Sequence, residues 1–394
     1  MQICICRVRV EYNFDEIVIH ARTGLNPRKN FILGKGNNRY ITIKNIKNNS
    51  LVIDDNTDFI DDEAVDMIHK RSQIKKGDIL FASIGRFGDT YIIEEEPTGW
   101  DINESVFAFT VDEKLIRQKY FHYLFKHKET IRQLTKNSSG STFKSIKMNQ
   151  LKKMRFDLPD LNSQDIIVSL LDCVTNIISI YEQELLLLDE LVKARFVEMF
   201  GDPVVNDKKW EIRHFGDLGE LKRGKSKHRP RNDPILLGGK YPLIQTGDVT
   251  NSNTYIKSYT STYSEEGLKQ SKMWKKGTLC ITIAANIAES AILTFDACFP
   301  DSVVGFTPNG EVISLFIHYW LSFLQPILEE NAPAVAQKNL NVATLEKVGV
   351  IVPPLELQNQ FALFVQEIDK SRLRELLAIK QIKLLLHDSW FLFY

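Results

Sequence analysis

One stretch of the chain occurs twice, and this duplication constrains the fold more than any other feature of the sequence. Residues 143–164 read FKSIKMNQLKKMRFDLPDLNSQ, and residues 337–358 read QKNLNVATLEKVGVIVPPLELQ. The copies align without a gap at an offset of 194 positions, so that a proline and the final glutamine of one copy match those of the other. Because the offset is about half of the 394 residues, the sequence predicts two copies of one fold unit.

The segments that precede the two copies also follow one common order. Short runs of alternating apolar residues, bounded by turn residues, are typical of β-strands. The first half has such runs at 40–46, 77–85, 89–95 and 104–111, followed by a helix-like segment at 120–134. The second half has them at 241–249, 277–284 and 301–308, followed by a helix-like segment at 317–328. We therefore predict a mixed domain of strands and helices in each half.

A long segment with helical periodicity follows each domain. A proline at its start cannot continue sheet pairing and marks the beginning of a helix. Apolar residues then recur at alternating steps of four and three, the a and d spacing of a coiled coil. The predicted seam of the first helix is Ile167, Leu171, Val174, Ile178, Tyr181, Leu185, Leu188, Val192 and Met199, interrupted only at Arg195. The same frame gives Phe361, Val365, Ile368, Arg372, Glu375, Ile379, Ile382 and Leu386 in the second helix.

The length of these helices bears on how they pack. A helix of about 38 residues is about 57 Å long, too long to pack only on its own small domain. We predict an α+β fold of two duplicated mixed domains, each followed by a long helix, with the helices paired as an antiparallel coiled coil. The predicted division is a first domain at 1–158, its helix at 159–200, a second domain at 201–352 and its helix at 353–394. For either helix alone, the alternative is an amphipathic helix packed into a local core.

Charge and cysteine content narrow the class of protein. The 50 basic residues equal the 50 acidic ones, so a nucleic-acid site has to be a local patch. Such a patch is visible at 222–231 (KRGKSKHRPR), with six Lys or Arg and no acid, whereas 54–66 carries seven acids and no base. The five cysteines lack CxxC spacing and are expected to be reduced thiols of a cytoplasmic protein. A thiolate pair at Cys4 and Cys6 is a possible metal ligand set, but no second pair is near in sequence, so we predict no metal site.

No unbroken apolar run approaches the ~18 residues of a membrane span, so we predict no membrane segment. The sequence also lacks the motifs of the enzymes that act on DNA. Asp202-Pro203-Val204 lacks the second proline and the aromatic residue of an adenine methyltransferase pocket, and there is no GxxxxGK[ST] loop for ATP. Asp301 follows a proline but lacks the neighbouring acid and lysine of a nuclease, so we interpret it as a turn residue at a strand end.

Four strings in this order resemble the specificity subunit of type I restriction-modification enzymes. They are KGDILFASIG (76–85), EMFGDPVVNDKKWE (198–211), HFGDLGELKRGK (214–225) and VPPLELQNQ (352–360). The resemblance extends over essentially the whole chain. Two departures are the absence of a W-x-x-x-x-L-G-D-I-like opening in the first domain, and the loss of a glycine-rich turn after 277–284.

This resemblance implies a non-catalytic subunit with two target recognition domains, each reading one half of a split sequence in double-stranded DNA. The helices would set the spacer between the halves and dock two methyltransferase subunits, and two restriction subunits with translocase and nuclease activity would complete the enzyme. No cofactor is expected in this chain, while S-adenosylmethionine, ATP and Mg would bind to the partner subunits.

Exposed basic residues are the candidates for contacts with DNA phosphates. They lie around two equivalent glycines, Gly24 and Gly224, and in the repeated stretch. They are Arg28, Lys29, Lys144, Lys147 and Lys152 in the first half, and Lys222, Arg223, Lys225, Lys227, Arg229 and Arg231 in the second. The alternative for each run is a solvated charged face, but six positive charges in ten residues repel one another unless an anion joins them.

Base reading requires polar side chains that can pair with base edges. The candidates at strand ends and loops are Thr42, Lys44, Asn45, Ser83, Arg86, Ser141 and Thr142, and in the second half Gln245, Thr246, Asn286, Gln337 and Lys338. For any single residue of this set, a structural or phosphate-binding role is more common than base reading. The first long helix is a poor DNA contact, because 162–200 carries seven acids and two bases and suits a protein partner.

The sequence thus predicts a DNA-recognition subunit that supplies specificity to partner enzymes. Two other classes stay open: a self-contained DNA modification enzyme with an unrecognised site, and a coiled-coil scaffold that binds only proteins.

Overall fold

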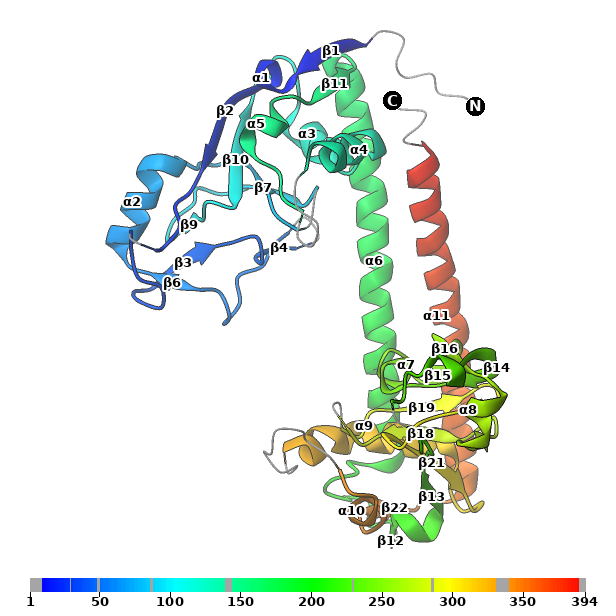
Figure 1. The fold of residues 1–394 in the computed structure, drawn as a ribbon. Helices are drawn as coiled ribbons and strands as arrows, with labels where there is room; N and C mark the ends of the chain where they lie inside the picture. The colour runs from blue at the N-terminus through cyan, green and yellow to red at the C-terminus, as the bar shows by residue number, and fades with distance from the viewer. Residues whose placement is uncertain are drawn as a thin grey trace. The chain divides into compact units, whose positions relative to one another are not determined.

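The computed structural model describes residues 9–28, 30–47, 50–85, 88–138, 144–228, 230–284, 287–330 and 340–389, the last four as backbone only. The chain forms two compact units, Met1–Ile180 with Ala378–Tyr394, and Tyr181–Leu377. We call them unit 1 and unit 2 and describe each by itself (Figure 1).

The main sheet of unit 1 has the strand order β2-β10-β7-β8, and all its neighbours are antiparallel. Its strands are β2 (Val18–Thr23), β7 (Ile79–Ala82), β8 (Thr90–Ile92) and β10 (Val106–Val111). All four side chains of β7 are buried, and they alternate between two cores. Ile79 and Phe81 join a core rich in phenylalanine, whereas Leu80 packs on the opposite face with Ile102. Coverage of both faces explains why this strand reads as a continuous apolar run.

The other elements of unit 1 surround this sheet. A second sheet has the order β6-β3-β9, with β3 (Asn38–Ile41), β6 (Phe59–Ile60) and β9 (Trp100–Ile102), and β4 (Ile46–Lys47) pairs with β5 (Ser50–Leu51). The strand β1 (Val10–Asn13) pairs with β11 (Arg155–Leu158). The short helices are α1 (Phe14–Ile17), α2 (Asp62–Ser72), α3 (Gln118–Leu124), α4 (Lys128–Asn137) and α5 (Met148–Leu151). The helix-like segment predicted at 120–134 is therefore two helices, α3 and α4.

Unit 2 repeats this arrangement. Its main sheet has the order β13-β21-β18-β19-β15, with β13 (Gly219–Arg223), β15 (Tyr255–Ile256), β18 (Leu279–Thr282), β19 (Ser290–Leu293) and β21 (Val303–Pro308). A second sheet has the order β16-β14-β20-β17, with β14 (Leu237–Leu243), β16 (Ser261–Tyr263), β17 (Met273–Trp274) and β20 (Ala297–Cys298). β12 (Ile212–His214) pairs with β22 (Gly349–Ile351), as β1 pairs with β11. The helices are η1 (Phe215–Leu218), η2 (Pro234–Leu236), α7 (Thr246–Thr250), α8 (Glu265–Lys269), α9 (Ser314–Glu330) and α10 (Val342–Glu346).

The first domain does have the opening that its sequence lacks. In unit 2 the Phe215 amide at the start of η1 donates a hydrogen bond to Val348 O (2.9 Å), and in unit 1 the Phe14 amide at the start of α1 donates to Met154 O (3.1 Å). Phe14 and Phe215 are both fully buried. The sequence departure therefore does not alter this turn, because one buried aromatic and one backbone bond preserve it without the surrounding motif.

A buried glutamine fixes the start of each long helix. In α6 (Leu161–Phe200), Gln164 Nε2 donates to Pro159 O and Leu115 O, and its Oε1 accepts from the Arg117 amide. In α11 (Leu355–Ser389), Gln358 makes the same three bonds to Pro353 O, Glu311 O and the Ile313 amide. Both glutamines are completely buried. The amide side chain, with donors and an acceptor, satisfies backbone groups at the point where the chain leaves the domain.

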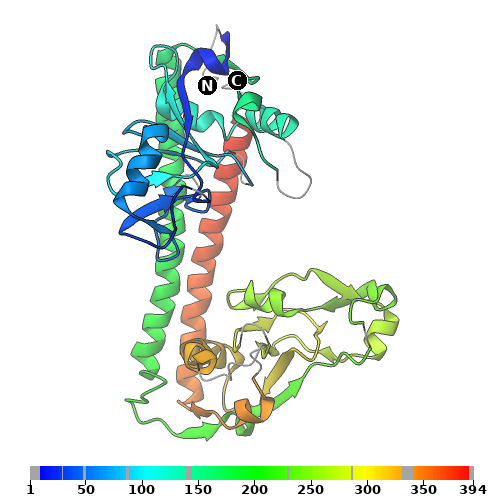
Figure 2. The ribbon, with the colours of Figure 1, turned by 60° about the vertical axis from the view of Figure 1, so that its left-hand side comes forward.

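The two long helices run antiparallel where they meet in unit 2. Residue numbers rise along one helix as they fall along the other, since Arg372 binds Asp189 while Phe361 packs against Phe196 and Phe200. Both figures show these two segments side by side (Figures 1 and 2). This confirms the predicted α+β fold with an antiparallel helix pair.

The seam itself differs from the prediction at one position. Phe196 is fully buried in the core of unit 2, whereas Arg195 is only half-buried and pairs with Glu198. The apolar frame shifts by one residue here, so that the predicted interruption is filled by Phe196. Among the other predicted seam residues, Phe361, Val365 and Ile379 are buried, and Val174, Ile178, Leu185, Leu188, Ile368 and Ile382 are half-buried. Ile167 and Leu171 pack in the core of the unit 1 domain, and the side chain of Leu386 lies outside the described residues.

The long helix α6 is apolar enough to be a candidate membrane span. By length and composition α6 could cross a membrane, with a mean hydropathy of 1.3 over an 18-residue window, of which 22% is buried. The prediction counted unbroken apolar runs, and α6 is interrupted by single charged residues such as Asp172. The helix starts from a packed domain and ends in the core of unit 2 at Phe196 and Phe200, so apolar residues at both of its ends pack into domain cores.

Candidate nucleic-acid interface

The densest basic segment extends from the end of β13 over the surface of unit 2. Lys222, Arg223, Lys225 and Lys227 are exposed, and Arg229 lies outside the described residues. Lys222 pairs with Glu220 on the same strand, and Arg231 pairs with Asp301 just before β21. The expectation that this run needs an external anion is therefore only partly right, because carboxylates of the same unit offset some of its charge.

A glycine leads into each basic loop for a steric reason. A Cβ on Gly224 would overlap the carbonyl oxygens of Phe299 and Pro300, and a Cβ on Gly24 would overlap Ile102 O. These contacts are equivalent, since Ile102 ends β9 and Phe299 follows β20, the matching strand of the second sheet. The predicted equivalence of the two loops is confirmed as a structural match. Arg28 in the first loop is exposed, and Lys29 lies outside the described residues.

A cavity in unit 2 brings together residues predicted for two different tasks. It has a volume of about 230 Å³ and contains the predicted phosphate ligand Arg231 and the predicted base readers Gln245 and Thr246. Arg231 comes from the basic loop, whereas Gln245 is the N-cap of α7 and Thr246 is the first residue of that helix.

Three polar side chains in the wall of this cavity were not predicted. They are Ser226, Asn232 and Ser302. Asn232 directly follows the basic run, which is a signal that the sequence offered, whereas Ser302 reaches the site only through the sheet. The Gln245 amide donates to Asp248 Oδ2 (2.8 Å), and Gln245 Nε2 donates to Ser261 Oγ (3.1 Å). The backbone of Gln245 is thus fixed, and its exposed side chain keeps one amide N–H that the bond to Ser261 does not use.

Two predicted base readers of unit 1 are structural residues. Asn45 is buried, and its Oδ1 accepts from Thr42 while its Nδ2 donates to Val52 O and Thr57 Oγ1. Ser83 is buried and donates to Ser105 O (2.7 Å). Neither side chain can meet a base without breaking these bonds, so the prediction is wrong for both. Thr42 is half-buried in the same turn, while Lys44 is exposed.

The repeated stretch lies against the end of β7. The Gly85 amide donates to Lys144 O and the Ile146 amide to Ser83 O, both at 2.9 Å. Unit 2 has the equivalent bond from the Leu340 amide to Ile283 O (2.9 Å). The structure thereby places the exposed Lys144 beside the turn after β7. Outside the described residues lie Arg86, Ser141, Thr142, Asn286, Gln337 and Lys338.

The remaining basic candidates of unit 1 differ in their surroundings. Lys147 is exposed at the start of α5, where its amide donates to Gln150 Oε1. Lys152 is exposed too, but its Nζ pairs with Asp15 of α1 at 3.0 Å. Lys152 is therefore already neutralised locally, and Lys147 is the better candidate for a phosphate.

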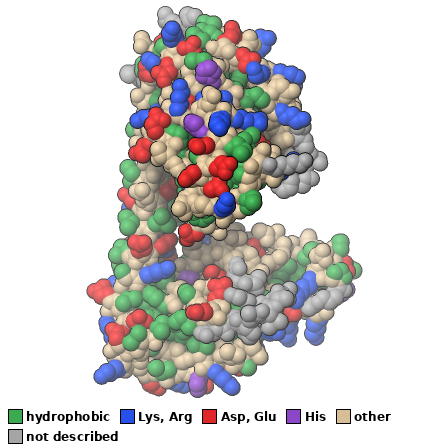
Figure 3. Space-filling view, turned by 90° about the vertical axis from the view of Figure 1, so that its left-hand side faces the viewer, with side chains coloured by type: hydrophobic (Ala, Val, Ile, Leu, Met, Phe, Trp, Pro, Cys, Tyr) green, Lys and Arg blue, Asp and Glu red, His purple; other side chains and the backbone are tan. Residues whose placement is uncertain are grey.

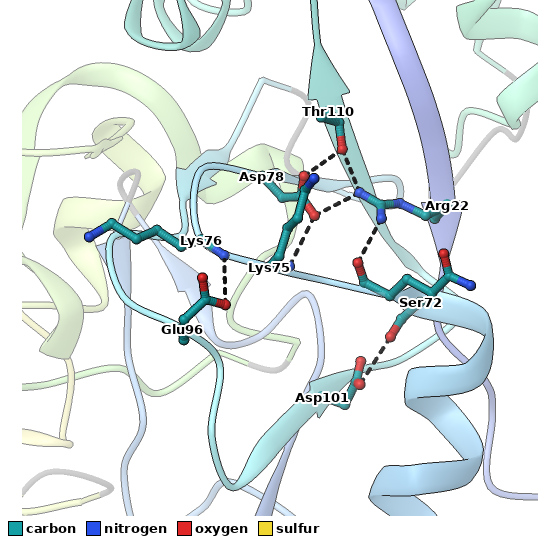
Figure 4. Close-up of polar contacts among 9 residues, drawn as sticks. Arg22, Ser72, Lys75, Lys76, Asp78, Glu96, Asp101 and Thr110 are labelled. Carbon is teal, nitrogen blue, oxygen red and sulfur yellow. Dashed lines mark hydrogen bonds and ion pairs between the residues drawn. The ribbon is translucent and has the colours of Figure 1, made fainter.

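A polar network holds the turn that leads into β7 (Figure 4). Arg22 of β2 donates to Asp78 Oδ2 (2.7 Å) and Thr110 Oγ1, Asp78 is completely buried, and the Lys75 amide donates to Asp78. The Lys76 amide binds Glu96, and in unit 2 the Lys276 amide binds Asp296 in the same way. This network orders the turn at the start of β7, while the candidate site lies at the other end of the strand.

Charge is segregated on the surface of unit 1. Figure 3 shows carboxylates gathered on the lower part of one face of this unit, with Lys and Arg side chains above them. The acidic segment 54–66 supplies exposed carboxylates, including Asp54, Asp55 and Asp62. A polyanion would be repelled from this part of the unit.

Each domain contains a histidine, half-buried His122 and buried His318, that cannot readily hold a proton. His122 Nδ1 lies 2.8 Å from Thr90 Oγ1 and His318 Nδ1 lies 3.1 Å from Ser290 Oγ, at matching positions of the two copies. Burial lowers the pKa of His122 to about 3 and that of His318 to about 4. His122 joins α3 to the edge strand β8 of unit 1, and His318 joins α9 to β19 of unit 2, so their role is structural.

The structure as a whole defines a class. Two copies of one α+β domain each contain a basic loop that follows a closely packed glycine, and each copy continues into a long helix with a fixed start. No group of three or more His, Cys, Asp or Glu residues that could hold a metal ion occurs in the described ranges, and Cys173, Cys280 and Cys298 are free thiols. Cys4 and Cys6 lie outside those ranges. These features define a class of recognition proteins that contain two copies of one domain and whose exposed polar groups suit binding.

Comparison with known proteins identifies the family. Residues 12–189 and 207–384 each match the type I restriction modification DNA specificity domain, so the chain belongs to that family and contains the domain twice. It is a non-catalytic specificity subunit with two target recognition domains, and its role is DNA sequence recognition in a type I system.

Individual relatives agree with this assignment. The chain is 24% identical over 312 residues to a protein of Methanocaldococcus jannaschii that carries the name MjaX specificity subunit, covering 74% of this chain and 72% of the relative. It is 22% identical over 338 residues to the type I restriction enzyme MjaIX specificity subunit of the same organism, covering 78% and 75%. Two solved structures share the fold. A chain from a study of complex assembly and conformational transition of the type I R-M system is 15% identical, with a TM-score of 0.60 and coverage of 98% and 97%. The S subunit from M. genitalium is 14% identical, with a TM-score of 0.51 and coverage of 98% and 95%.

Proposed function

We propose that each domain reads one half of a bipartite target in double-stranded DNA, and that the helix pair fixes the spacer between the halves. The observation that carries this proposal is the cavity of unit 2, where Arg231 from the basic loop lies with Gln245 and Thr246. The guanidinium of Arg231, whose charge Asp301 partly offsets, is thereby placed beside an exposed amide that can pair with adenine.

The division of tasks within the interface follows from exposure and pairing. Arg223, Lys225 and Lys227 are exposed, and the described part of the chain gives none of them a carboxylate partner, so they bind phosphates. Arg28, Lys144 and Lys147 do the same in unit 1. Gln245, Thr246 and Asn232 read bases in unit 2. In unit 1 the exposed Lys44 takes part in base reading, whereas Asn45 and Ser83 hold the turns on which the base-reading side chains lie.

The proposal includes the partners and the domain division. Two methyltransferase subunits bind the long helices, and two restriction subunits complete the enzyme in the cytoplasm. S-adenosylmethionine, ATP and Mg bind to those partners. The recognition domains extend over 1–158 and 201–352, and the spacer helices over 159–200 and 353–394, in keeping with the start of α6 at Leu161 and of α11 at Leu355.

The test uses the assembled methyltransferase and a library of DNA targets. Gln245→Ala should relax one base pair in one half-site, losing about 1 to 3 kcal/mol of discrimination, while the other half-site and the spacing stay unchanged. Arg223→Ala with Lys225→Ala and Lys227→Ala should weaken binding to all sequences and reduce the salt slope by about 0.9 for each phosphate that is no longer neutralised.

The matched control removes three exposed lysines of unit 2 outside the loop, as Lys209→Ala, Lys257→Ala and Lys276→Ala. If the control variant lost as much salt dependence as the loop variant, the basic loop would have no special role. A Gln245→Ala protein with unaltered preference at every base would remove this residue from the interface.

A further inference from the structure

One residue of the helix seam breaks its apolar pattern and is nevertheless buried. Arg372 falls on a predicted seam position of α11, and only 8% of it is exposed. Charged side chains are rarely buried to this extent unless they are paired. Its position in the first copy of the repeat, 194 residues earlier, is taken by the half-buried Ile178. The duplication has therefore placed a charge in only one of two equivalent seam positions.

The surroundings of Arg372 come from three elements of unit 2. Its guanidinium binds Asp189 of α6 across the helix pair, and it binds Asp369 one turn earlier on its own helix at 2.8 Å. Tyr319 of α9 lines the same cavity as Arg372 and Asp189. Arg372 is thus the point at which both long helices meet the late helix of the recognition domain.

Tyr319 has a partner further into the second domain. The Tyr319 hydroxyl lies 3.2 Å from Thr254 Oγ1, next to the start of β15. The neighbouring His318 binds Ser290 of β19. Both strands belong to the main sheet that also contains β13 and leads to the basic loop. A chain of neighbouring side chains therefore connects the helix seam with the sheet that carries the candidate interface.

The energetics of such a group favour a role in positioning. Replacing a buried ion pair by apolar residues of similar size is often neutral or stabilising, whereas removing one partner alone is costly. A single polar residue at an a or d position, by contrast, specifies the register of a coiled coil at some cost in stability. A cavity of about 370 Å³ adjoins the pair and is lined by Asp189, Tyr319 and Arg372, so the site can adapt to other side chains without a clash.

We propose that Arg372 is a positioning residue that fixes the register of the helix pair and the seating of the second recognition domain, and thereby the distance between half-sites that the protein accepts. This inference rests on the proposed function of the helices as the spacer. An apolar residue at 372 leaves the two helices paired but lets neighbouring registers compete. Asp189 is the partner that makes one register preferred.

The test measures methylation by the assembled methyltransferase on targets with fixed half-sites and spacers that vary one base pair at a time. The wild-type protein should prefer one spacer. Arg372→Leu combined with Asp189→Leu should keep a melting temperature equal to or above that of the wild type and the same half-site preference. Its preference for the best spacer over the two neighbouring ones should fall at least tenfold. Arg372→Lys, with Asp189 intact, should keep part of the spacer preference that the double leucine variant loses, because lysine keeps the charge without the fork geometry of arginine.

Three outcomes separate the possibilities. A double leucine variant with unaltered spacer preference would overturn the positioning role, whatever its melting temperature. Loss of stability in Arg372→Leu alone, with full spacer preference in the double variant, would likewise reduce Arg372 to a packing residue. A wild-type protein that accepted many spacers equally would refute the spacer function itself, which is distinct from failure of this inference.

Discussion

His122 and His318 show how single residues keep their role through the duplication. His122 and His318 contact a hydroxyl at the same place in each sheet, and burial depresses the pKa of both. In the unfolded chain they would titrate near pH 6.5. The folded protein therefore binds fewer protons than the unfolded chain at mildly acidic pH.

Acid should weaken the fold through these residues. The histidine contribution is constant above about pH 6.5 and declines as pH falls below that value, by up to about 1.4 kcal/mol per pH unit for each histidine. The loss is complete once pH is below the folded pKa values of about 4 and about 3. Melting temperatures at pH 7, 6 and 5 should decline less steeply for the double variant His122→Asn with His318→Asn than for the wild type. Equal slopes would contradict the assignment.

At the scale of elements, the long helices are continuous with the domain cores. Phe196 and Phe361 lie 5.5 Å apart between ring centroids, and Phe196 also stacks on Phe316 of α9 at 5.5 Å. The helix pair in unit 2 is thus held by the same core as the recognition domain.

Truncation of this aromatic contact should destabilise unit 2. Phe196→Ala removes a fully buried ring and should lower the free energy of unfolding by about 3 to 5 kcal/mol. The neighbouring Arg195→Ala is the control, since its pair with Glu198 is exposed and contributes less than about 1 kcal/mol. Urea unfolding followed by tryptophan fluorescence would report both. If Arg195→Ala lowered the free energy of unfolding more than Phe196→Ala, the seam would pass through position 195, as the sequence predicted, and not through Phe196.

The two long helices could be predicted from the sequence, whereas parts of their seam and of the candidate site could not. Heptad spacing and the prolines located both helices, since periodicity is a local property. The seam at Phe196 could not be found, because a shift of frame by one residue depends on the core that the helix meets. Asn45 and Ser83 were assigned to base reading because their residue types suit it, and only their contacts reveal turns. The cavity with Arg231 and Gln245 depends on sheet pairing between distant segments.

At the scale of the whole molecule, helix length should determine which spacer is recognised. Deleting seven residues from each of α6 and α11 shortens each helix by about 10 Å, which corresponds to about 3 base pairs of DNA. Methylome sequencing should then show both half-sites unchanged and a spacer shorter by about that number. Altered half-site bases with an unaltered spacer would refute the role of the helices as the spacer.

The buried glutamines at the two helix starts have a consequence for how new specificities arise. Within the described residues, Gln164 and Gln358 bind groups of the domain that precedes them, by the same three bonds in both copies. Each domain therefore carries its own complete attachment to a helix. Genetic exchange within the repeated stretch would join a foreign domain to a resident helix without an unmatched polar group at the junction. Recombination could thus replace one half of the target in a single event, while the geometry that the partner enzymes depend on is inherited intact.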